Sequence, residues 1–417
     1  MEAILKWVEE KLMPPMAKLA EQRHLRAVRD GIVATLPLII VGSFFLIVAS
    51  PPIPALSAKV QPYAAQILLL YRLSVGLMAL YAVHGIGYSL AKSYNLDPVT
   101  GGLLALASFI MINLPQNIEN IGFVLPISGL GGAGLFSAII MAFFAVEVMR
   151  FLTERKITIK MPEGVPESVA RSFEALIPAA VIMVIIYIVR IALNINIQEV
   201  IMNLFKPLVT AGDSLVGVLV PVLLITLLWS AGIHGVSVVG SIARPIWMTL
   251  LDANTQAAAA GSKILPHIAP EPFFQWFIWI GGSGATLCLV LLMLTSRSKY
   301  LRNLGRASIL PGICNINEPV VFGTPIVLNP ILAIPFILGP VVTAILTYLA
   351  MAANLVGRPY ILAPWTLPAP IGAYLATGGD WRAAVLVLIN IAITTLIYFP
   401  FFKLYERKLL EEESSDN

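Results

Sequence analysis

Residues 383–402, AAVLVLINIAITTLIYFPFF, form a continuous apolar stretch that contains no charged side chain. The hydrocarbon core of a bilayer is about 30 Å thick, so a helix needs roughly 20 mostly apolar residues to cross it. This stretch has that length and that composition. It therefore predicts a membrane-spanning helix near the end of the chain.

Similar stretches recur along the whole chain and bring the expected number of crossings to about ten. Most are continuous apolar runs rather than segments of alternating polarity, which favours a helical bundle over a β-barrel. The predicted fold class is an all-α polytopic membrane protein. The remaining stretches are Gly31–Ala49, Ile67–Leu90, Val99–Leu114, Gly132–Phe151, Ala175–Leu193, Leu215–Trp229, Phe273–Leu294, Ile326–Ala352 and Tyr360–Ala376.

The composition of the 417-residue chain excludes a soluble enzyme. Hydrophobic residues make up 58% and charged residues only 12%, whereas an average soluble domain carries about 25% charged residues. The sequence has no phosphate-binding GxxxxGK[ST] loop, no HExxH and no CxxC motif. Cys288 and Cys314 lie 26 residues apart in apolar surroundings and predict neither a disulfide framework nor a metal site. No metal or cofactor is expected.

The distribution of basic residues predicts the orientation in the membrane. Eighteen of the 27 lie in four segments, while the connections around 50–66 and 115–130 hold only Lys59. By the positive-inside rule both termini face the cytoplasm. Membrane orientation thus accounts for the positive net charge, and no nucleic-acid partner is expected. The four segments hold Lys6, Lys11, Lys18, Arg23, Arg26 and Arg29; Arg150, Arg155, Lys156, Lys160 and Arg171; Arg297, Lys299, Arg302 and Arg306; and Lys403, Arg407 and Lys408.

The chain divides into five parts by composition. Residues 1–30 predict a cytoplasmic amphipathic segment on the membrane surface, with Trp7 as its interface anchor. Residues 31–195 predict an N-terminal half of five helices, 196–211 an amphipathic linker helix, 212–403 a C-terminal transport half, and 404–417 a cytoplasmic tail.

Two segments of the C-terminal half are too polar and too rich in proline and glycine to be ordinary spans. They are Gly232–Pro272 and Ile309–Pro330, and strongly apolar stretches flank them. Irregular backbone at membrane depth is tolerated only where protein buries it or where it lines a wet cavity. We therefore expect two re-entrant hairpins with a substrate site between them.

Glu318, in Asn315-Ile316-Asn317-Glu318-Pro319, is the best candidate for chemistry at this site. An ionisable group inside a membrane is energetically costly and is a site hypothesis by default. Its carboxylate can accept protons from sugar hydroxyls, and Asn317 offers both donors and acceptors. The alternative role of Glu318 is a buried carboxylate that caps a half-helix.

His234, in Gly232-Ile233-His234-Gly235, is the second candidate. An imidazole can orient a hydroxyl, and the flanking glycines allow close approach of the backbone. The alternative role is packing.

Three further residues are expected to contact substrate. Trp229 and Trp365 lie beside polar or proline-rich breaks and offer indole faces to a sugar ring, although an interface belt is the alternative. Arg72 either snorkels to the outer interface or donates to a sugar hydroxyl.

Four spaced motifs carry a resemblance to a known family. They are the Ala20–Gly31 stretch, the Gly232–Gly235 turn, the Asn317–Ile326 stretch, and the run from Pro364-Trp365-Thr366 to Gly378-Gly379-Asp380-Trp381. Over essentially the whole chain the sequence resembles enzyme IIC, the membrane component of the bacterial phosphoenolpyruvate-dependent sugar phosphotransferase system. It is most similar to the lactose/cellobiose/diacetylchitobiose family.

The resemblance implies ten crossing helices, two re-entrant hairpins and a homodimer built through the N-terminal half, in a bacterial cell membrane. It also implies that Glu318 and His234 lie at the sugar near the hydroxyl that receives phosphate, with Glu318 as the catalytic residue. Trp229 and Trp365 match positions that contact the sugar rings.

The expected function is inward movement of a β-linked disaccharide for phosphorylation by partner proteins. The chain ends at Asn417, shortly after its last span, so the enzyme IIB phosphocysteine domain and enzyme IIA are expected as separate polypeptides. The chain alone would not be an enzyme. Alternatives are a proton-coupled sugar symporter, with Glu318 and His234 as a relay, and a non-transporting sensor. The sequence leaves the disaccharide open among cellobiose, diacetylchitobiose and lactose.

Overall fold

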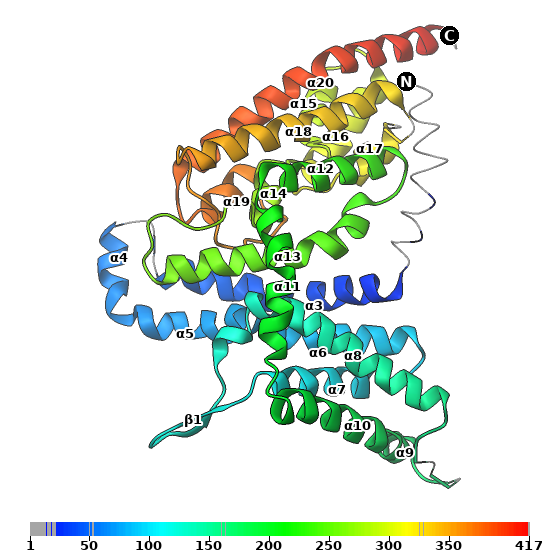
Figure 1. The fold of residues 1–417 in the computed structure, drawn as a ribbon. Helices are drawn as coiled ribbons and strands as arrows, with labels where there is room; N and C mark the ends of the chain where they lie inside the picture. Colours follow the sequence, from blue (N-terminus) through cyan, green and yellow to red (C-terminus); the bar gives the residue numbers. More distant parts are fainter. Residues whose placement is uncertain are drawn as a thin grey trace. The chain divides into compact units, whose positions relative to one another are not determined.

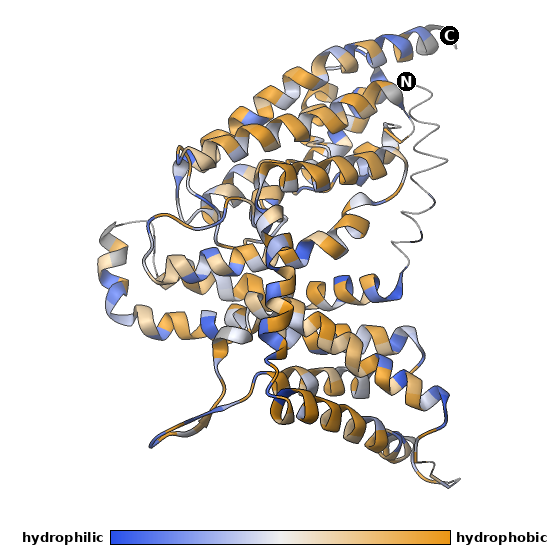
Figure 2. Cartoon of the chain, viewed as in Figure 1, coloured by the Kyte–Doolittle hydropathy of each residue, from blue (hydrophilic) through white to orange (hydrophobic). Residues whose placement is uncertain are grey.

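A computed structural model describes residues 14, 18, 22–49, 51, 54–159, 161–162, 164–324, 326–327 and 329–415. These residues are mostly helical (Figure 1), and apolar residues dominate the long helices (Figure 2). Trp7 and most of the predicted amphipathic segment at 1–30 lie outside the described residues. The chain folds as two compact units, which we call the N-terminal unit (Ala20–Gly42 and Leu69–Val209) and the C-terminal unit (Ser43–Leu68 and Thr210–Asn417, grouped with Met1–Leu19).

The N-terminal unit is built around α6 (Met78–Ser93), which packs against α7 and α8. Small residues bring the backbones close, since a Cβ at Gly87 would lie 2.7 Å from the carbonyl oxygen of Gly101. The other elements are α3 (Arg23–Ala49), α5 (Ala64–Ser74), η3 (Val75–Leu77), α7 (Pro98–Ile112), β1 (Gln116–Ile118), β2 (Gly122–Val124), η4 (Ile127–Gly129), η5 (Gly132–Gly134), α8 (Leu135–Glu154), α9 (Glu167–Glu174), α10 (Leu176–Tyr187), η6 (Ile188–Ala192) and α11 (Ile197–Gly212). Of these, α3, α5 and α11 each continue into the C-terminal unit.

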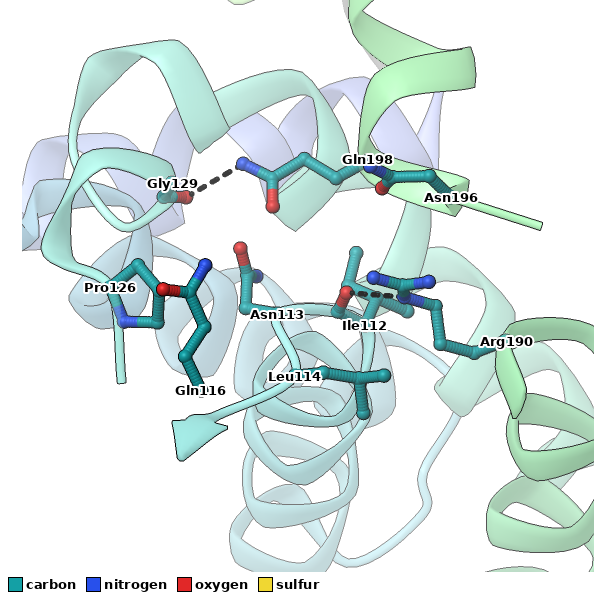
Figure 3. A pocket seen from close by; sticks show the side chains of 9 residues that line it. All are labelled: Ile112, Asn113, Leu114, Gln116, Pro126, Gly129, Arg190, Asn196 and Gln198. Atoms are coloured by element: carbon teal, nitrogen blue, oxygen red, sulfur yellow. Dashed lines mark hydrogen bonds between the residues drawn. The ribbon is translucent and has the colours of Figure 1, made fainter. Parts of the chain in front are cut away.

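Each end of the N-terminal unit has its own polar contacts between helices. At one end Glu147 on α8 accepts hydrogen bonds from the Tyr94 hydroxyl at 2.7 Å and from His24 Nε2 at 2.9 Å. Burial, and then this bond to Glu147, raise the pKa of Tyr94. At the other end Arg190 Nε, in the π-helical turn η6, donates to the carbonyl oxygen of Ile112 at 3.1 Å (Figure 3).

The C-terminal unit contains an extensive apolar core, in which α18 packs against α12 and α20. Its fully buried aromatic side chains are Phe273, Phe274, Trp276, Phe277, Phe336, Tyr398 and Phe402. The elements are α4 (Pro54–Val60), η2 (Gln61–Tyr63), α12 (Leu215–Ser230), α13 (Gly235–Ala259), α14 (Glu271–Phe277), α15 (Leu287–Leu294), α16 (Lys299–Ile313), α17 (Glu318–Gly323), α18 (Pro330–Ala352), α19 (Ala369–Ala376) and α20 (Trp381–Ser415).

Three segments of the C-terminal unit differ from the helices expected from sequence. The stretch 273–294 is two helices, α14 and α15, joined by a glycine-rich turn. The stretch 360–376 is helical only from Ala369. Within 232–272, which is expected from its sequence to form a re-entrant hairpin, residues 235–259 form one continuous helix, α13.

The polar side chains of α13 explain these differences. Asn254 donates from Nδ2 to the carbonyl oxygens of His267 and Pro359, at 2.8 and 2.9 Å, and accepts from the His267 amide at 2.8 Å. Thr255 Oγ1 donates to the carbonyl oxygen of Tyr360 at 2.7 Å. These residues do not break α13. They pair the backbone of the two non-helical segments beside it, as a buried backbone requires.

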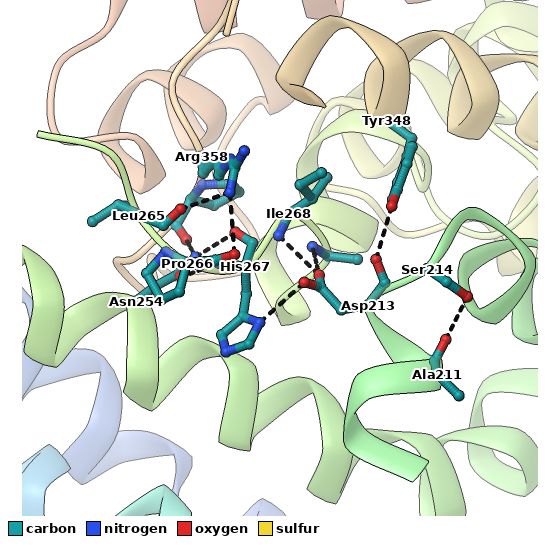
Figure 4. A network of polar contacts seen from close by, with 12 residues as sticks. Ala211, Asp213, Ser214, Asn254, Leu265, Pro266, His267, Ile268, Tyr348 and Arg358 are labelled. Carbon is teal, nitrogen blue, oxygen red and sulfur yellow. Dashed lines mark hydrogen bonds and ion pairs between the residues drawn. The ribbon is translucent and has the colours of Figure 1, made fainter. Parts of the chain in front are cut away.

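Asp213, between α11 and α12, fixes a neighbouring loop (Figure 4). Its Oδ1 accepts from the amides of Ile268 and Ala269, both at 2.8 Å, and its Oδ2 lies 3.0 Å from His267 Nδ1. The Tyr348 hydroxyl donates to the Asp213 carbonyl oxygen at 3.1 Å. One carboxylate thus holds the start of α12 to the loop before α14.

The polytopic helical class predicted from sequence is confirmed. Within the described ranges, six helices are long and apolar enough to cross a membrane, or seven if α11 and α12 form one broken span. Ten crossings and two re-entrant hairpins stay predictions.

The Asp213 contacts yield a paired prediction. Asp213→Ala leaves the Ile268 and Ala269 amides unpaired, at about 1–3 kcal/mol for each buried group. Asp213→Asn keeps one oxygen acceptor for the two amides, loses the charge, and places an NH2 group where Oδ2 faces His267. We expect the apparent Tm in detergent to fall markedly for the alanine variant and by less than half as much for the asparagine variant. Equal losses would contradict the amide-pairing role.

Candidate functional site

The backbone turns sharply at Asn315, between α16 and α17. Asn315 has a φ of +62°, a left-handed conformation that asparagine tolerates better than most residues. Its Oδ1 accepts from the Gly281 amide at 2.9 Å, and its Nδ2 donates to the carbonyl oxygens of Trp365 and Leu367 at 2.8 and 2.9 Å. One side chain therefore joins three segments that are far apart in sequence.

Asn317 lies against the same glycine-rich turn. Its side chain is 4% exposed, and Nδ2 donates to the carbonyl oxygen of Ser283 at 2.9 Å. Gly282, at φ +98°, has no room for a side chain, because a Cβ there would lie 2.7 Å from the Asn317 Cβ. The amide nitrogen of Asn317 thus holds the turn, and its contact with substrate stays a prediction.

Glu318 begins α17 and is exposed. Among the described residues, no side chain or backbone group forms a hydrogen bond or ion pair with its carboxylate. Buried Asn317 precedes it and Pro319 follows it, so its backbone is restrained while its side chain remains accessible. The half-helix-capping alternative predicts contacts to the carboxylate, and the described residues provide none.

Aromatic contacts place His234 near α17. The His234 ring lies 4.5 Å from the Trp229 ring, centroid to centroid, and Trp229 lies 6.3 Å from Phe322 in an edge-to-face arrangement. Phe322 is four residues after Glu318 on α17, so the two share a helix face. The turn at Gly232 also approaches this segment, since a Cβ there would lie 3.2 Å from Val327 Cγ1.

The structure fixes the orientation of the His234 ring. His234 caps α13, and its Nδ1 accepts from the Ser237 amide at 3.2 Å. An amide can only donate, so in the neutral ring the proton is on Nε2. The Trp229 side chain is 3% exposed, and its Nε1 is a buried donor with no acceptor in the described part of the chain.

Trp365 is held by its backbone rather than by its ring. Its carbonyl oxygen accepts from Asn315, and its side chain is 48% exposed. Farther along the same run, Asp380 accepts from the Gly357 amide at 2.7 Å and from Arg382 Nε at 2.8 Å. Burial alone would raise the pKa of the Asp380 carboxyl. The hydrogen bonds from Arg382 and Gly357 stabilise the carboxylate more strongly, so the net pKa of Asp380 is lowered.

Five of the six sequence-predicted residues belong to the C-terminal unit: Trp229, His234, Asn317, Glu318 and Trp365. The rings of Trp229 and His234 lie together beside Phe322 of α17, the helix that Glu318 begins. Trp365 is joined to this segment through the bond of its carbonyl oxygen to Asn315. Arg72, on α5, belongs to the N-terminal unit, and its role stays a prediction.

Sequence reasoning missed two residues of this arrangement. Phe322 was detectable from its i,i+4 spacing to Glu318. The supporting role of Asn315 had no local signal, because its partners lie 34 to 52 positions away.

A substitution tests the supporting role of Asn315. Asn315→Ala unpairs Gly281 and two carbonyls, at about 1–3 kcal/mol for each buried group. Asn354→Ala is the matched control, because Asn354 is exposed and also left-handed, at φ +56°. We expect the Asn315 variant to lose several degrees more in apparent Tm than the control. Equal losses would mean that backbone strain alone explains the effect.

Comparisons with known proteins identify the family of the chain. The family model described as "Phosphotransferase system, EIIC" matches residues 29–340. The chain is 41% identical to the cellobiose-specific EIIC component of Geobacillus stearothermophilus, over 100% of this chain and 97% of that protein. It is 41% identical to the lichenan permease IIC component of Bacillus subtilis (strain 168), over 98% and 94%.

A solved structure is also similar. The crystal structure of the transporter ChbC, the IIC component from the N,N'-diacetylchitobiose-specific phosphotransferase system, superposes with a TM-score of 0.93. The two chains are 40% identical, and the match covers 98% of this chain and 99% of that one. Family match, relatives and structure agree, and the chain belongs to the EIIC family of the phosphotransferase system.

Proposed function

We propose that this protein is a sugar-specific EIIC permease that moves a β-linked disaccharide of the cellobiose or diacetylchitobiose type inward for phosphorylation. One observation carries the proposal: Trp229 contacts both His234 and Phe322, and Phe322 lies one turn from the accessible Glu318. An aromatic surface beside a histidine and a carboxylate suits a ring with an apolar face and hydroxyls at its edge. The names of the relatives support the β-linked class.

In this proposal each group has a separate task. The exposed rings of Trp365 and Phe322 hold the sugar rings, and the largely buried Trp229 supports Phe322 and reaches the sugar with its ring edge. His234 donates from Nε2 to a hydroxyl, and Asn317 accepts one at Oδ1 while its Nδ2 stays bonded to Ser283. Arg72 is proposed as a further donor to the sugar.

Glu318 acts as the general base. The sugar hydroxyl oxygen attacks the phosphorus of a phosphocysteine on a partner protein, the O–P bond forms, the S–P bond breaks, and the thiolate leaves. Glu318 accepts the hydroxyl proton, a role that needs an accessible carboxylate within hydrogen-bond reach. The phosphorylated sugar is charged and leaves the apolar pathway.

The partners follow from the same scheme. EIIC components work with EIIB and EIIA proteins, and lactose-specific relatives from Staphylococcus carry the name EIICB. We propose separate EIIB and EIIA partners, a homodimer formed through the N-terminal half, and cytoplasmic termini. The five parts proposed are 1–30, 31–195, 196–211, 212–403 and 404–417.

Glu318→Gln tests the catalytic assignment. It preserves the shape of the side chain and removes the base, so phosphorylation of cellobiose or diacetylchitobiose should fall by about 10²- to 10⁴-fold. The assay uses membranes supplied with phosphorylated EIIA and EIIB, and sugar binding is measured in parallel. Glu411→Gln, an exposed variant on α20, serves as the control. A wild-type phosphorylation rate would refute the base role.

The family match gives no support to the symporter alternative. A transport experiment distinguishes a symporter from a phosphotransferase permease. Purified protein in vesicles without EIIA and EIIB should not concentrate unmodified cellobiose or diacetylchitobiose under a pH gradient. Accumulation above the external concentration would favour the symporter. Sugar binding with neither flux nor phosphorylation would favour a sensor.

A further inference from the structure

The N-terminal unit contains a polar pocket that none of the proposed sugar-binding residues lines. Its volume is about 300 Å³, and it lies beside the end of α7, the strand β1 and the turn η6 (Figure 3). Its polar lining residues are Asn113, Gln116, Arg190, Asn196 and Gln198.

Arg190 supplies a fixed positive charge. Its Nε is bonded to the Ile112 carbonyl oxygen at 3.1 Å, and in the described part of the chain its two Nη groups have no acceptor. Arg190 lies in a π-helical turn, an irregularity that often occurs at functional sites. The bond from Nε fixes the position of the guanidinium, and its two Nη groups can each donate to one oxygen of a phosphate.

The amides around Arg190 add donors and acceptors. Asn113 Nδ2 donates to the Phe109 carbonyl oxygen at 2.9 Å, and Gln198 Nε2 donates to the Gly129 carbonyl oxygen at 3.2 Å. Their side-chain oxygens therefore remain as acceptors, and Gln116 offers both kinds of group. A ligand that matches this set carries an anionic phosphate together with hydroxyls.

The charge balance of the lining favours an anion. No carboxylate lines the pocket, and the nearby Glu199 is hydrogen-bonded to Asn196 at 3.2 Å. The lining also has no aromatic ring on which a sugar could stack. A second sugar site is therefore disfavoured.

The surroundings of Arg190 indicate where such an anion comes from. The adjoining helix α10 and turn η6 expose large apolar side chains: Val184, Tyr187, Ile188, Ile191 and Leu193 are 46% to 60% exposed. In a membrane protein, lipid acyl chains are the natural partners of such a face. An arginine near the end of a lipid-facing helix can extend its guanidinium to the headgroup region.

We propose that this pocket binds the headgroup of an anionic phospholipid, with the phosphate at Arg190 and headgroup hydroxyls at the Asn113, Gln116 and Gln198 amides. Phosphatidylglycerol carries both features. The site is independent of the sugar site and of the proposed function.

Native mass spectrometry of the full chain in detergent tests the proposal, with phosphatidylglycerol and phosphatidylcholine as probes. Wild type should retain phosphatidylglycerol preferentially, and Arg190→Gln should weaken that retention about tenfold, because charge-assisted hydrogen bonds are lost. Arg155→Gln, which removes an exposed arginine outside the pocket, should leave it unchanged. Equal retention of both lipids, or by the Arg190 variant and wild type, overturns the proposal.

A second variant and a competition experiment complete the test. If Arg190→Gln does not fold, Gln116→Leu removes a donor and acceptor without touching the bond to Ile112, and it should also weaken phosphatidylglycerol retention. The competition experiment adds sn-glycerol 1-phosphate, which has the headgroup but no acyl chains and should not displace the lipid at equal concentration. Displacement at equal concentration would identify a soluble phosphate ester as the ligand and overturn the lipid assignment.

Discussion

The backbone around the candidate site can be irregular only because side-chain amides pair its polar groups. Inside a bilayer an unpaired N–H or C=O has no water to bond, at a cost of several kcal/mol. Asn315 and Asn317 pair with Gly281, Ser283, Trp365 and Leu367, and Asn254 does the same for His267 and Pro359. These amides let the glycine turn, the loop at 365–367 and the start of α17 meet without regular secondary structure.

The same constraint explains why Glu318 stands apart from its neighbours. The asparagines on either side of Ile316 are buried and bonded to backbone, whereas the carboxylate is exposed and has no partner among the described residues. The neutral amides of the two asparagines pair the buried backbone groups, because burial costs a neutral group less solvation free energy than it costs an ion. The charged group stays accessible.

The sequence predicted what depends on local composition. Long apolar runs identified the class, and the proline and glycine content of 309–330 marked the break that the structure has between α16 and α17. It did not anticipate the single helix α13 within 232–272, where Asn254 and Thr255 instead pair distant backbone groups. Their partners lie 105 residues away at Pro359 and Tyr360, and pairings over such separations leave no periodic signal. The contact of Trp229 with Phe322 was hidden for the same reason.

The three hydrogen bonds of Asn315 also bear on energy coupling. One side chain joins the glycine turn to the loop that carries Trp365. In the proposed function both segments border the sugar. A site that keeps its shape binds unmodified sugar with similar affinity whichever side of the membrane it faces, and by itself it only equalises the two concentrations. Any uphill accumulation must then come from removing free sugar as a different chemical species, and the supply of phosphoryl groups sets its extent.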